Sequence, residues 1–83
     1  MMNLNFKLDK SAGASPAYSQ IVQFIENSIR TDKLRPGDKL PPERELAEQL
    51  GTARGTIKKA YEELERKSLI EAAQGRGSFV SAA

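Results

Sequence analysis

The chain has 83 residues, of which 39% are hydrophobic and 29% charged, and its formal net charge is only +2. This length suits one small domain with one core. Cysteine and histidine are both absent, which removes disulfides, thiolate metal sites and the usual general base near neutral pH. We therefore expect no catalytic residues, no metal site and no cofactor. No apolar run approaches the ~20 residues that cross a bilayer, and no signal peptide is evident, so we expect a cytoplasmic protein.

The N-terminal segment, residues 3–9, alternates between apolar and polar side chains. Leu4, Phe6 and Leu8 would share one face, which predicts a short strand with one buried side. A loop follows. We assign residues 1–14 to this strand and loop, and residues 15–83 to the main domain.

The first helix is expected to open at Ser15-Pro16, with the serine as N-cap and the proline in the first helical position. An apolar stripe at spacings of three and four marks its inner face: Tyr18, Ile21, Val22, Ile25 and Ile29. The helix should end before Pro36, because the residue ahead of a proline is pushed out of the α region. Residues 39–40 are expected to be extended.

A second helix is predicted to start near Pro42, which fits its first turn, and to close at Gly51 as a left-handed C-cap. Its inner face carries Leu46, Ala47 and Leu50. Two residues then lead into a third helix at about 54–67, with these inward positions: Ile57, Ala60, Tyr61, Leu64 and Leu69. Strands at 70–73 and 78–80, joined by the glycine-rich residues 74–77, predict a hairpin.

The second and third helices match the requirements of a helix-turn-helix. This motif needs a small residue where the helices approach, a glycine in the turn and a branched apolar residue on the second helix. Ala47, Gly51 and Ile57 supply these in order. A plain helical hairpin can also have a glycine in its turn, so the spacing alone leaves that alternative open.

The order of charges along the third helix favours a DNA-reading role. Its opening holds Arg54, Lys58 and Lys59 without an acid, and its later part holds Glu62, Glu63 and Glu65. A helix built only for stability would have the reverse order, to suit its dipole. In a recognition helix the N-terminal residues enter the major groove, so basic residues belong there.

Individual contacts on this helix can be predicted. Arg54 would reach a guanine or a phosphate, Thr56 would donate its hydroxyl to a phosphate, and Gly55 would allow close backbone approach. Lys58 lies on the flank. For Lys59, a DNA contact and a solvated position are about equally expected.

Two further arginines are candidates outside the third helix. Arg44, in the first turn of the second helix, would contact a phosphate; the alternative is an ion pair with Glu48. Arg76, at the hairpin tip, could enter a minor groove, where arginine meets enhanced negative potential. The alternative for Arg76 is a solvated turn residue.

At this point the chain resembles the N-terminal DNA-binding domain of GntR-type bacterial regulators, over about residues 16–80. The segments that carry the resemblance are Tyr18-Ser19-Gln20-Ile21, residues 34–41, residues 43–47, Leu50-Gly51, Arg54 with Thr56-Ile57, Ala60-Tyr61 with Leu64-Glu65, and residues 75–80. The start of the chain and residues 60–64 look most like the YtrA branch. The branch fused to an aminotransferase-like domain remains an alternative.

The resemblance implies a mainly α fold with a small β-hairpin, a winged helix-turn-helix. It implies a homodimer, at least on DNA, bound to a near-palindromic double-stranded operator with no membrane partner. The implied contacts come from the recognition helix in the major groove and from residues 74–77, at the tip of the hairpin wing, at the minor groove. They are made by Arg44, Arg54, Thr56 and the position of Lys58, with Gln74, Gly75 and Arg76 in the wing.

Two positions depart from the family pattern. Ala53 replaces the usual hydroxyl residue and weakens the N-cap of the third helix, and Gly55 stands where Ser, Thr or Asn is common. In the family a second domain normally senses an effector or dimerises, so we expect these residues to be either the DNA-binding part of a longer regulator or an unusually small member of the family. A winged helix that docks proteins is the rival function, and it predicts an exposed apolar patch on the third helix or wing.

Overall fold

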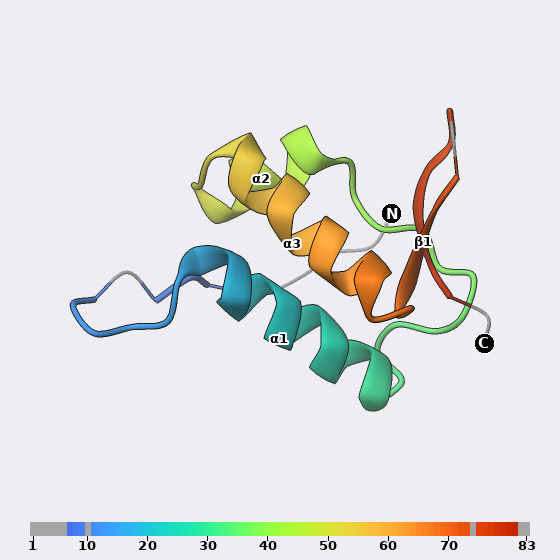
Figure 1. The fold of residues 1–83 in the computed structure, drawn as a ribbon, viewed down its shortest axis with the longest axis horizontal. Coiled ribbons are helices and arrows are strands. Elements are labelled where there is room, and N and C mark those ends of the chain that lie inside the picture. Colours follow the sequence, from blue (N-terminus) through green and yellow to red (C-terminus); the bar gives the residue numbers. More distant parts are fainter. Residues whose placement is uncertain (1–6, 10, 74, 82–83) are drawn as a thin grey trace.

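The computed structural model describes residues 7–9, 11–73 and 75–81. Within these ranges the chain forms three helices followed by an antiparallel hairpin (Figure 1). Their bounds are α1 (Ala17–Arg30), α2 (Glu43–Leu50), α3 (Arg54–Arg66), β1 (Ile70–Ala73) and β2 (Gly77–Val80). Most of the predicted N-terminal strand lies outside the described residues. Its described part, residues 7–9, is not in a strand, although Leu8 packs against the core.

The start of α1 differs by one residue from the prediction. The helix begins at Ala17, and Pro16 is the N-cap with extended backbone (φ −54°, ψ 148°), without a side-chain cap. The Ser15 carbonyl instead accepts a hydrogen bond from Nε2 of Gln20 at 2.7 Å. The side-chain amide of Gln20 also pairs with the backbone of Asp9. Its Oε1 accepts a hydrogen bond from the Asp9 N–H, and its Nε2 donates one to the Asp9 carbonyl, both at 2.8 Å. Gln20 therefore ties the segment before α1 to the helix.

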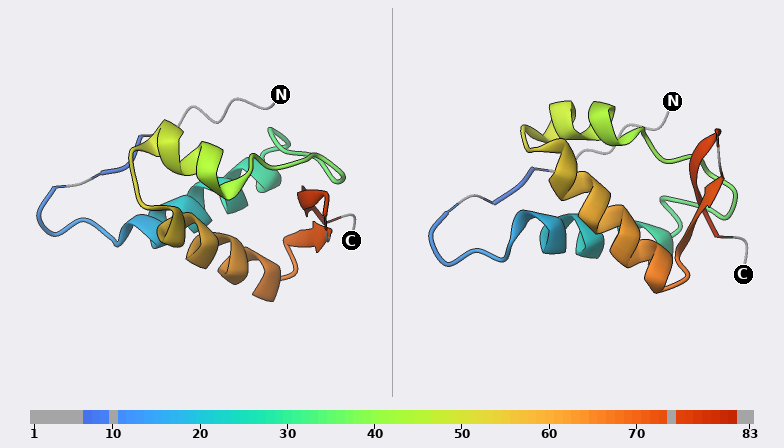
Figure 2. Two further views of the ribbon diagram at one scale, coloured as in Figure 1. Left: turned by 90° about the horizontal axis from the view of Figure 1, so that it is seen from above. Right: turned by 45° about the horizontal axis from the view of Figure 1, so that its top comes forward.

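The core lies between α3 and the two helices on either side of it. Figures 1 and 2 show α1 and α3 running side by side, α2 against the first half of α3, and the hairpin at the far end of α3. The buried apolar residues are Ile21, Val22, Ile25, Leu34, Leu40, Leu46, Ala47, Leu50, Ile57, Ala60, Tyr61, Leu64, Ile70 and Val80. Each fully buried aliphatic side chain contributes about 1.5–3 kcal/mol, so the apolar stripes predicted from the sequence supply most of the packing.

The turn between α2 and α3 forms as predicted. Gly51 adopts the left-handed conformation (φ 66°) at the C-cap, and the Thr52 N–H donates to the Ala47 carbonyl at 3.0 Å. The start of α2 again differs by one residue, because Pro42 is the N-cap with extended backbone (ψ 150°) and lies before the first turn. The short turn sets the steep crossing of α2 over α3 that a helix-turn-helix needs.

The hairpin is anchored to the segment that leads into α2. Lys39 pairs with Phe79 in an antiparallel bridge, the Leu40 N–H donates to the Ser78 carbonyl, and the Val80 N–H donates to the Asp38 carbonyl, both at 2.8 Å. The predicted extended residues 39–40 therefore run beside β2 and join the two-stranded sheet through this isolated bridge. Figure 1 shows this green segment crossing beside the red hairpin, which we call the wing, residues 70–80.

Candidate nucleic-acid interface

The start of α2, the start of α3 and the wing border one open groove of about 440 Å³. The residues that line it are Pro41, Pro42, Glu43, Arg44, Arg54, Tyr61, Gly77 and Ser78. Two of the predicted DNA contacts, Arg44 and Arg54, thus lie with the wing around a single hollow, although they come from different helices. The fold brings together the three elements that the sequence singled out.

Arg54 is held by a partner that the sequence analysis did not foresee. Its Nε lies 3.7 Å from Oε1 of Glu43, in the first turn of α2. The Arg54 side chain is 64% exposed and that of Glu43 33% exposed, so the pair is a surface ion pair worth little to stability. Its main consequence is orientation, because one edge of the guanidinium faces Glu43 while most of the side chain stays accessible.

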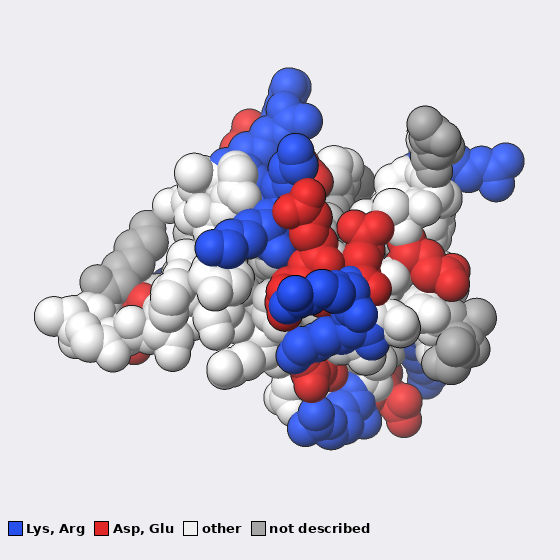
Figure 3. Space-filling view, in the orientation of Figure 1, with Lys and Arg blue, Asp and Glu red and all other residues white. Residues whose placement is uncertain are grey.

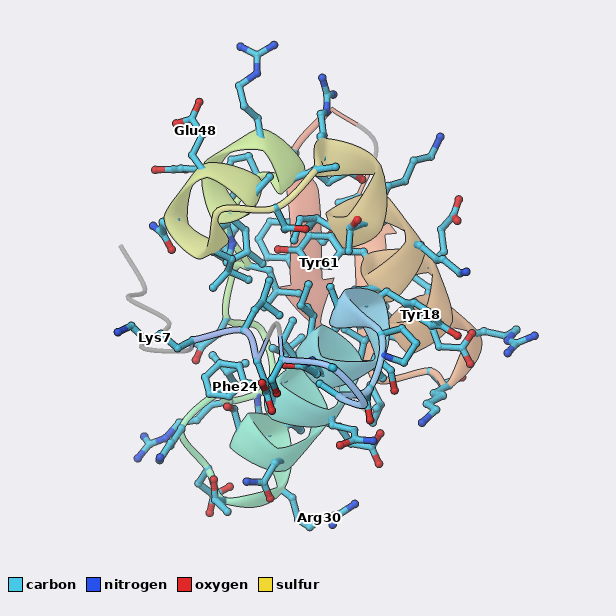
Figure 4. The ribbon with its side chains drawn as sticks, turned by 90° about the vertical axis from the view of Figure 1, so that its left-hand side faces the viewer. Lys7, Tyr18, Phe24, Arg30, Glu48 and Tyr61 are labelled. Atoms are coloured by element: carbon cyan, nitrogen blue, oxygen red, sulfur yellow. The ribbon has the colours of Figure 1, made fainter. Side chains whose placement is uncertain are left out.

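Arg44 is exposed on the first turn of α2. The alternative considered for it, an ion pair with Glu48, does not form. In Figure 4, Glu48 projects outward from α2. Among the described residues, the Arg44 side chain has no hydrogen bond or ion pair, so its charge is available at the groove.

Tyr61 fixes the relative position of α2 and α3. It is 3% exposed, and its hydroxyl donates a hydrogen bond of 2.7 Å to the Pro41 carbonyl. Figure 4 shows its ring in the space between α2, α3 and the wing. Burial raises the pKa of the Tyr61 hydroxyl far above its ordinary value, and the negative charge of Glu43 raises it further. The hydroxyl therefore stays protonated above pH 10, where a solvated tyrosine ionises, and still donates to Pro41 there.

The other predicted residues of α3 lie in different environments. Lys58 is exposed without a side-chain partner among the described residues, and Thr56 is half-buried. No heavy atom lies within 4 Å of the position that a Cβ would take on Gly55. Lys59 points toward α1, where its Nζ lies 4.1 Å from the centre of the Tyr18 ring. That contact is a cation–π interaction, so Lys59 helps to pack α3 on α1.

Two predictions from the sequence concern the start of α3 and the tip of the wing. Ala53 is the N-cap of α3 and makes no side-chain cap hydrogen bond, which confirms the weak cap. At the wing tip, Arg76 is exposed and its N–H donates to the Ala73 carbonyl at 2.9 Å. Gly75 has a φ of 80°, as a tight turn requires. Gln74 lies outside the described residues, and its predicted role stays a prediction.

Charged side chains gather over the helices on one face of the molecule. Figure 3 shows basic side chains along the upper edge, above α2 and the start of α3, and another at the wing on the right. Acidic side chains lie below them, over the later turns of α3. The start of α3 is itself exposed and basic, with Arg54 and Lys58 on its surface, whereas a protein-docking winged helix would be expected to present an apolar patch there.

A larger hollow of about 610 Å³ lies elsewhere, along α1 and the end of α3, and includes the half-buried Phe24. Its charges are of both signs and already paired, since Glu26 bonds Arg30 at 3.2 Å and Lys67 at 3.0 Å. None of the predicted contact residues lines it. Within the described ranges, no group of side chains could hold a metal ion and no helix is long and apolar enough to span a membrane.

Comparison with known proteins identifies the family. The family described as "Bacterial regulatory proteins, gntR family" matches residues 17–80. The chain belongs to this family. One relative, the HTH-type transcriptional repressor YtrA of Bacillus subtilis, is 43% identical over 68 residues, which are 82% of this chain and 52% of YtrA. Another, the regulator SmoD of Agrobacterium fabrum, is 38% identical over 72 residues, 87% of this chain and 31% of SmoD. The chain thus spans about half, or less, of these relatives.

Solved structures confirm the winged helix-turn-helix fold. YtrA from Sulfolobus acidocaldarius, a GntR-family transcription factor, superposes with a TM-score of 0.79 at 39% identity, covering 89% of this chain and 76% of that one. The DNA-binding domain of AraR, solved in complex with operator ORX1, superposes with a TM-score of 0.85 at 32% identity. That match covers 96% of this chain and all of the AraR domain.

Proposed function

We propose that this GntR-family chain binds double-stranded DNA sequence-specifically, as the DNA-binding domain of a bacterial transcriptional regulator. The observation that carries the proposal is the convergence of Arg44, Arg54 and the wing around one groove. The AraR domain, which has this fold, is bound to operator DNA in its structure. The exposed basic start of α3 supports the proposal that this helix enters the major groove, and Arg76 at the wing tip supports a wing contact at the minor groove.

The first turns of α3 supply the base contacts in this proposal. Arg54 donates to a guanine edge, with its guanidinium oriented by Glu43. Gly55 lets the backbone approach the DNA closely, and the Thr56 hydroxyl donates to a phosphate. Lys58, on the exposed flank, neutralises a phosphate. We assign Lys59 to the packing against Tyr18, with at most a long-range effect on the DNA.

The elements on either side of α3 fix its register on the duplex. Arg44 binds a phosphate from the start of α2, since its charge has no partner within the described residues. At the wing, Arg76 enters the minor groove, where narrow grooves attract arginine. Gly75 allows the turn, and Gln74 is proposed beside them as a further wing contact.

The regulator is proposed to act in the cytoplasm as a homodimer on a near-palindromic operator. One domain offers one recognition helix and one wing, which read one half-site. The match covers 52% of YtrA and 31% of SmoD and leaves out the rest of each, and we propose that any effector-sensing role lies outside the DNA-binding domain. We propose no catalytic activity, because the relatives are transcriptional regulators.

A selection from random duplexes, followed by titration of the selected site, tests the proposal. The chain should enrich one sequence, and its affinity should fall steeply with salt, with a slope of log affinity on log salt of about −0.9 per phosphate neutralised. Absence of binding to any duplex at low salt would refute the proposal.

Two variants of α3 separate base reading from phosphate binding. Arg54→Ala should cost about 1–3 kcal/mol on the selected site and much less on random duplexes. Lys58→Ala, the matched loss of one positive charge on the same helix, should weaken all duplexes about equally. A loss of binding free energy below a few tenths of a kcal/mol for Arg54→Ala would mean that Arg54 is a solvated surface residue and does not read a base.

A further inference from the structure

Lys39 is a basic residue of the wing base that the sequence reasoning did not select. It is exposed, and its side chain has no hydrogen bond or ion pair within the described ranges. Its backbone is held firmly, because Lys39 bridges Phe79 while the neighbouring Leu40 and Asp38 bond the wing strand at 2.8 Å. An exposed lysine is usually a solvated residue on a mobile stem, but here the stem starts from a fixed point.

The direction of the Lys39 stem follows from the sheet register. Directly paired residues share a face of a sheet, and so do residues two apart on one strand. Lys39, Phe79 and Gly77 therefore lie on the same face, opposite the face that buries Leu40 and Val80. The Lys39 Cε lies 3.2 Å from the position that a Cβ would take on Gly77. The stem thus runs along the wing toward its tip.

This placement puts a further positive charge, that of Lys39, beside the proposed DNA contacts. Gly77 lines the groove with Arg44 and Arg54, and it directly follows Arg76 at the wing tip. The absence of a side chain at Gly77 is what leaves room for the Lys39 stem there.

Given the proposed DNA-binding function, on which this step rests, we infer that Lys39 is a second wing cation that binds a phosphate of the DNA backbone next to the minor groove. A lysine ammonium is a point charge on a flexible stem, so it suits a phosphate better than a base edge. Its contribution is therefore the same for every sequence, and it positions the wing so that Arg76 meets the groove. Gly77 pairs with Ala73 in the hairpin, and it also provides the surface against which the Lys39 stem lies.

Salt titration of the intact chain on one selected duplex tests the inference. Lys39→Met keeps the aliphatic stem on Gly77 and removes the charge, so the slope of log affinity on log salt should become shallower by about 0.9. Lys39→Arg restores the charge and should restore the slope. Lys33→Met is the matched control, since Lys33 is an exposed lysine in the turn after α1 and, unlike Lys39, is not paired with the wing. Thermal unfolding of each variant checks that the fold is kept.

A second readout locates the contact. Ethylation of single phosphates should interfere with binding of the wild-type chain at one phosphate flanking the minor groove, and this interference should disappear for Lys39→Met. An unchanged slope for Lys39→Met, or an equal change for Lys33→Met, would overturn the role of Lys39 and leave the proposed function intact. Failure of the wild-type chain to bind duplexes at low salt would instead overturn the proposed function itself.

Discussion

Glu43 introduces a negative charge into a surface that we propose to meet DNA. A carboxylate there repels phosphates, yet it lies 3.7 Å from the Nε of Arg54 and limits where that guanidinium points. A side chain that is already oriented loses less conformational freedom on binding, so the pair exchanges some overall affinity for selectivity.

Glu43→Gln should therefore have opposite effects on two kinds of DNA. Affinity for random duplexes should rise because a negative charge is lost, while preference for the selected site should fall by part of the ~1–3 kcal/mol that a bidentate arginine supplies. Competition titrations measure both. Glu48→Gln removes the same charge from a residue that projects outward from α2 and forms no ion pair with Arg54. Equal behaviour of the two variants would mean that Glu43 acts only through net charge.

Two glycines with open surroundings should respond oppositely to the same substitution. At Gly55 and at Gly75 no heavy atom lies within 4 Å of the Cβ position. Gly55 is in the first turn of α3, where alanine favours the helix by roughly 0.5–1 kcal/mol. Gly75 has a φ of 80°, a conformation that is strained for alanine.

In denaturant unfolding, the midpoint of Gly55→Ala should thus lie above that of the wild type, and the midpoint of Gly75→Ala should lie below it. Because both sites have room for a Cβ, the sign of the stability change depends on the backbone conformation alone. A shift of both midpoints in one direction would contradict this account. A stabilised Gly55→Ala that also lost DNA affinity would indicate that the glycine is kept for close approach to the DNA.

At the scale of elements, Tyr61 links α3 to the segment that starts α2. Its pKa is raised by burial and by Glu43 above the ordinary value of 10.0, so the folded chain holds this proton more tightly than the unfolded chain does. The stabilisation is complete below pH 10, where both states are protonated. Above pH 10 the unfolded state releases the proton and the folded state does not, so stability falls as pH rises.

The free energy of unfolding should accordingly fall above pH 10 by up to about 1.4 kcal/mol per pH unit through this group. Below pH 10 the free energy of unfolding of Tyr61→Phe should be about 0.5–1.5 kcal/mol lower than that of the wild type, because the hydrogen bond to Pro41 is lost. Above pH 10 it should fall less steeply than in the wild type. Tyr18→Phe is the control, since it leaves Tyr61 in place and should keep the steep fall. Parallel pH profiles for Tyr61→Phe and the wild type would show that Tyr61 does not titrate differently on unfolding.

The elements themselves could be predicted because their signals are local. Apolar spacing located the three helices, and Gly51 located the turn, since a left-handed C-cap is a property of one residue. Helix starts were missed by one residue at Pro16 and Pro42, because a proline fits either the N-cap or the first turn and only its ψ angle decides.

The candidate site was predicted less completely because its contacts join distant segments. The pairing of Arg54 with Glu43 spans two helices, and the contact of Lys59 with Tyr18 depends on how α1 packs on α3. The course of the Lys39 side chain over Gly77 follows from its bridge to Phe79, forty residues later in the chain. Local patterns carry no information about such pairs until the crossing of the helices and the sheet register are known.

At the scale of the whole molecule, the size of the domain suits one half-site of a two-part operator. Its extents are 37 × 26 × 24 Å, and successive turns of B-DNA are about 34–36 Å apart. Two copies can therefore lie side by side on one face of the duplex, each with α3 in its own major groove, when their shorter dimension runs along the DNA. A near-palindromic operator would present the same groove to each copy.

We expect two chains on each selected duplex and a symmetric selected sequence, which sedimentation of the complex and sequencing measure. Insertion of five base pairs between the half-sites turns them to opposite faces of the duplex, because a full turn takes about 10 base pairs. Any cooperativity between the two copies should then vanish in stepwise mobility shifts, while each half-site still binds one chain. Random duplex of equal length, at equal salt, controls for length-dependent loading. A single chain on an asymmetric selected site would show that one domain reads the whole operator.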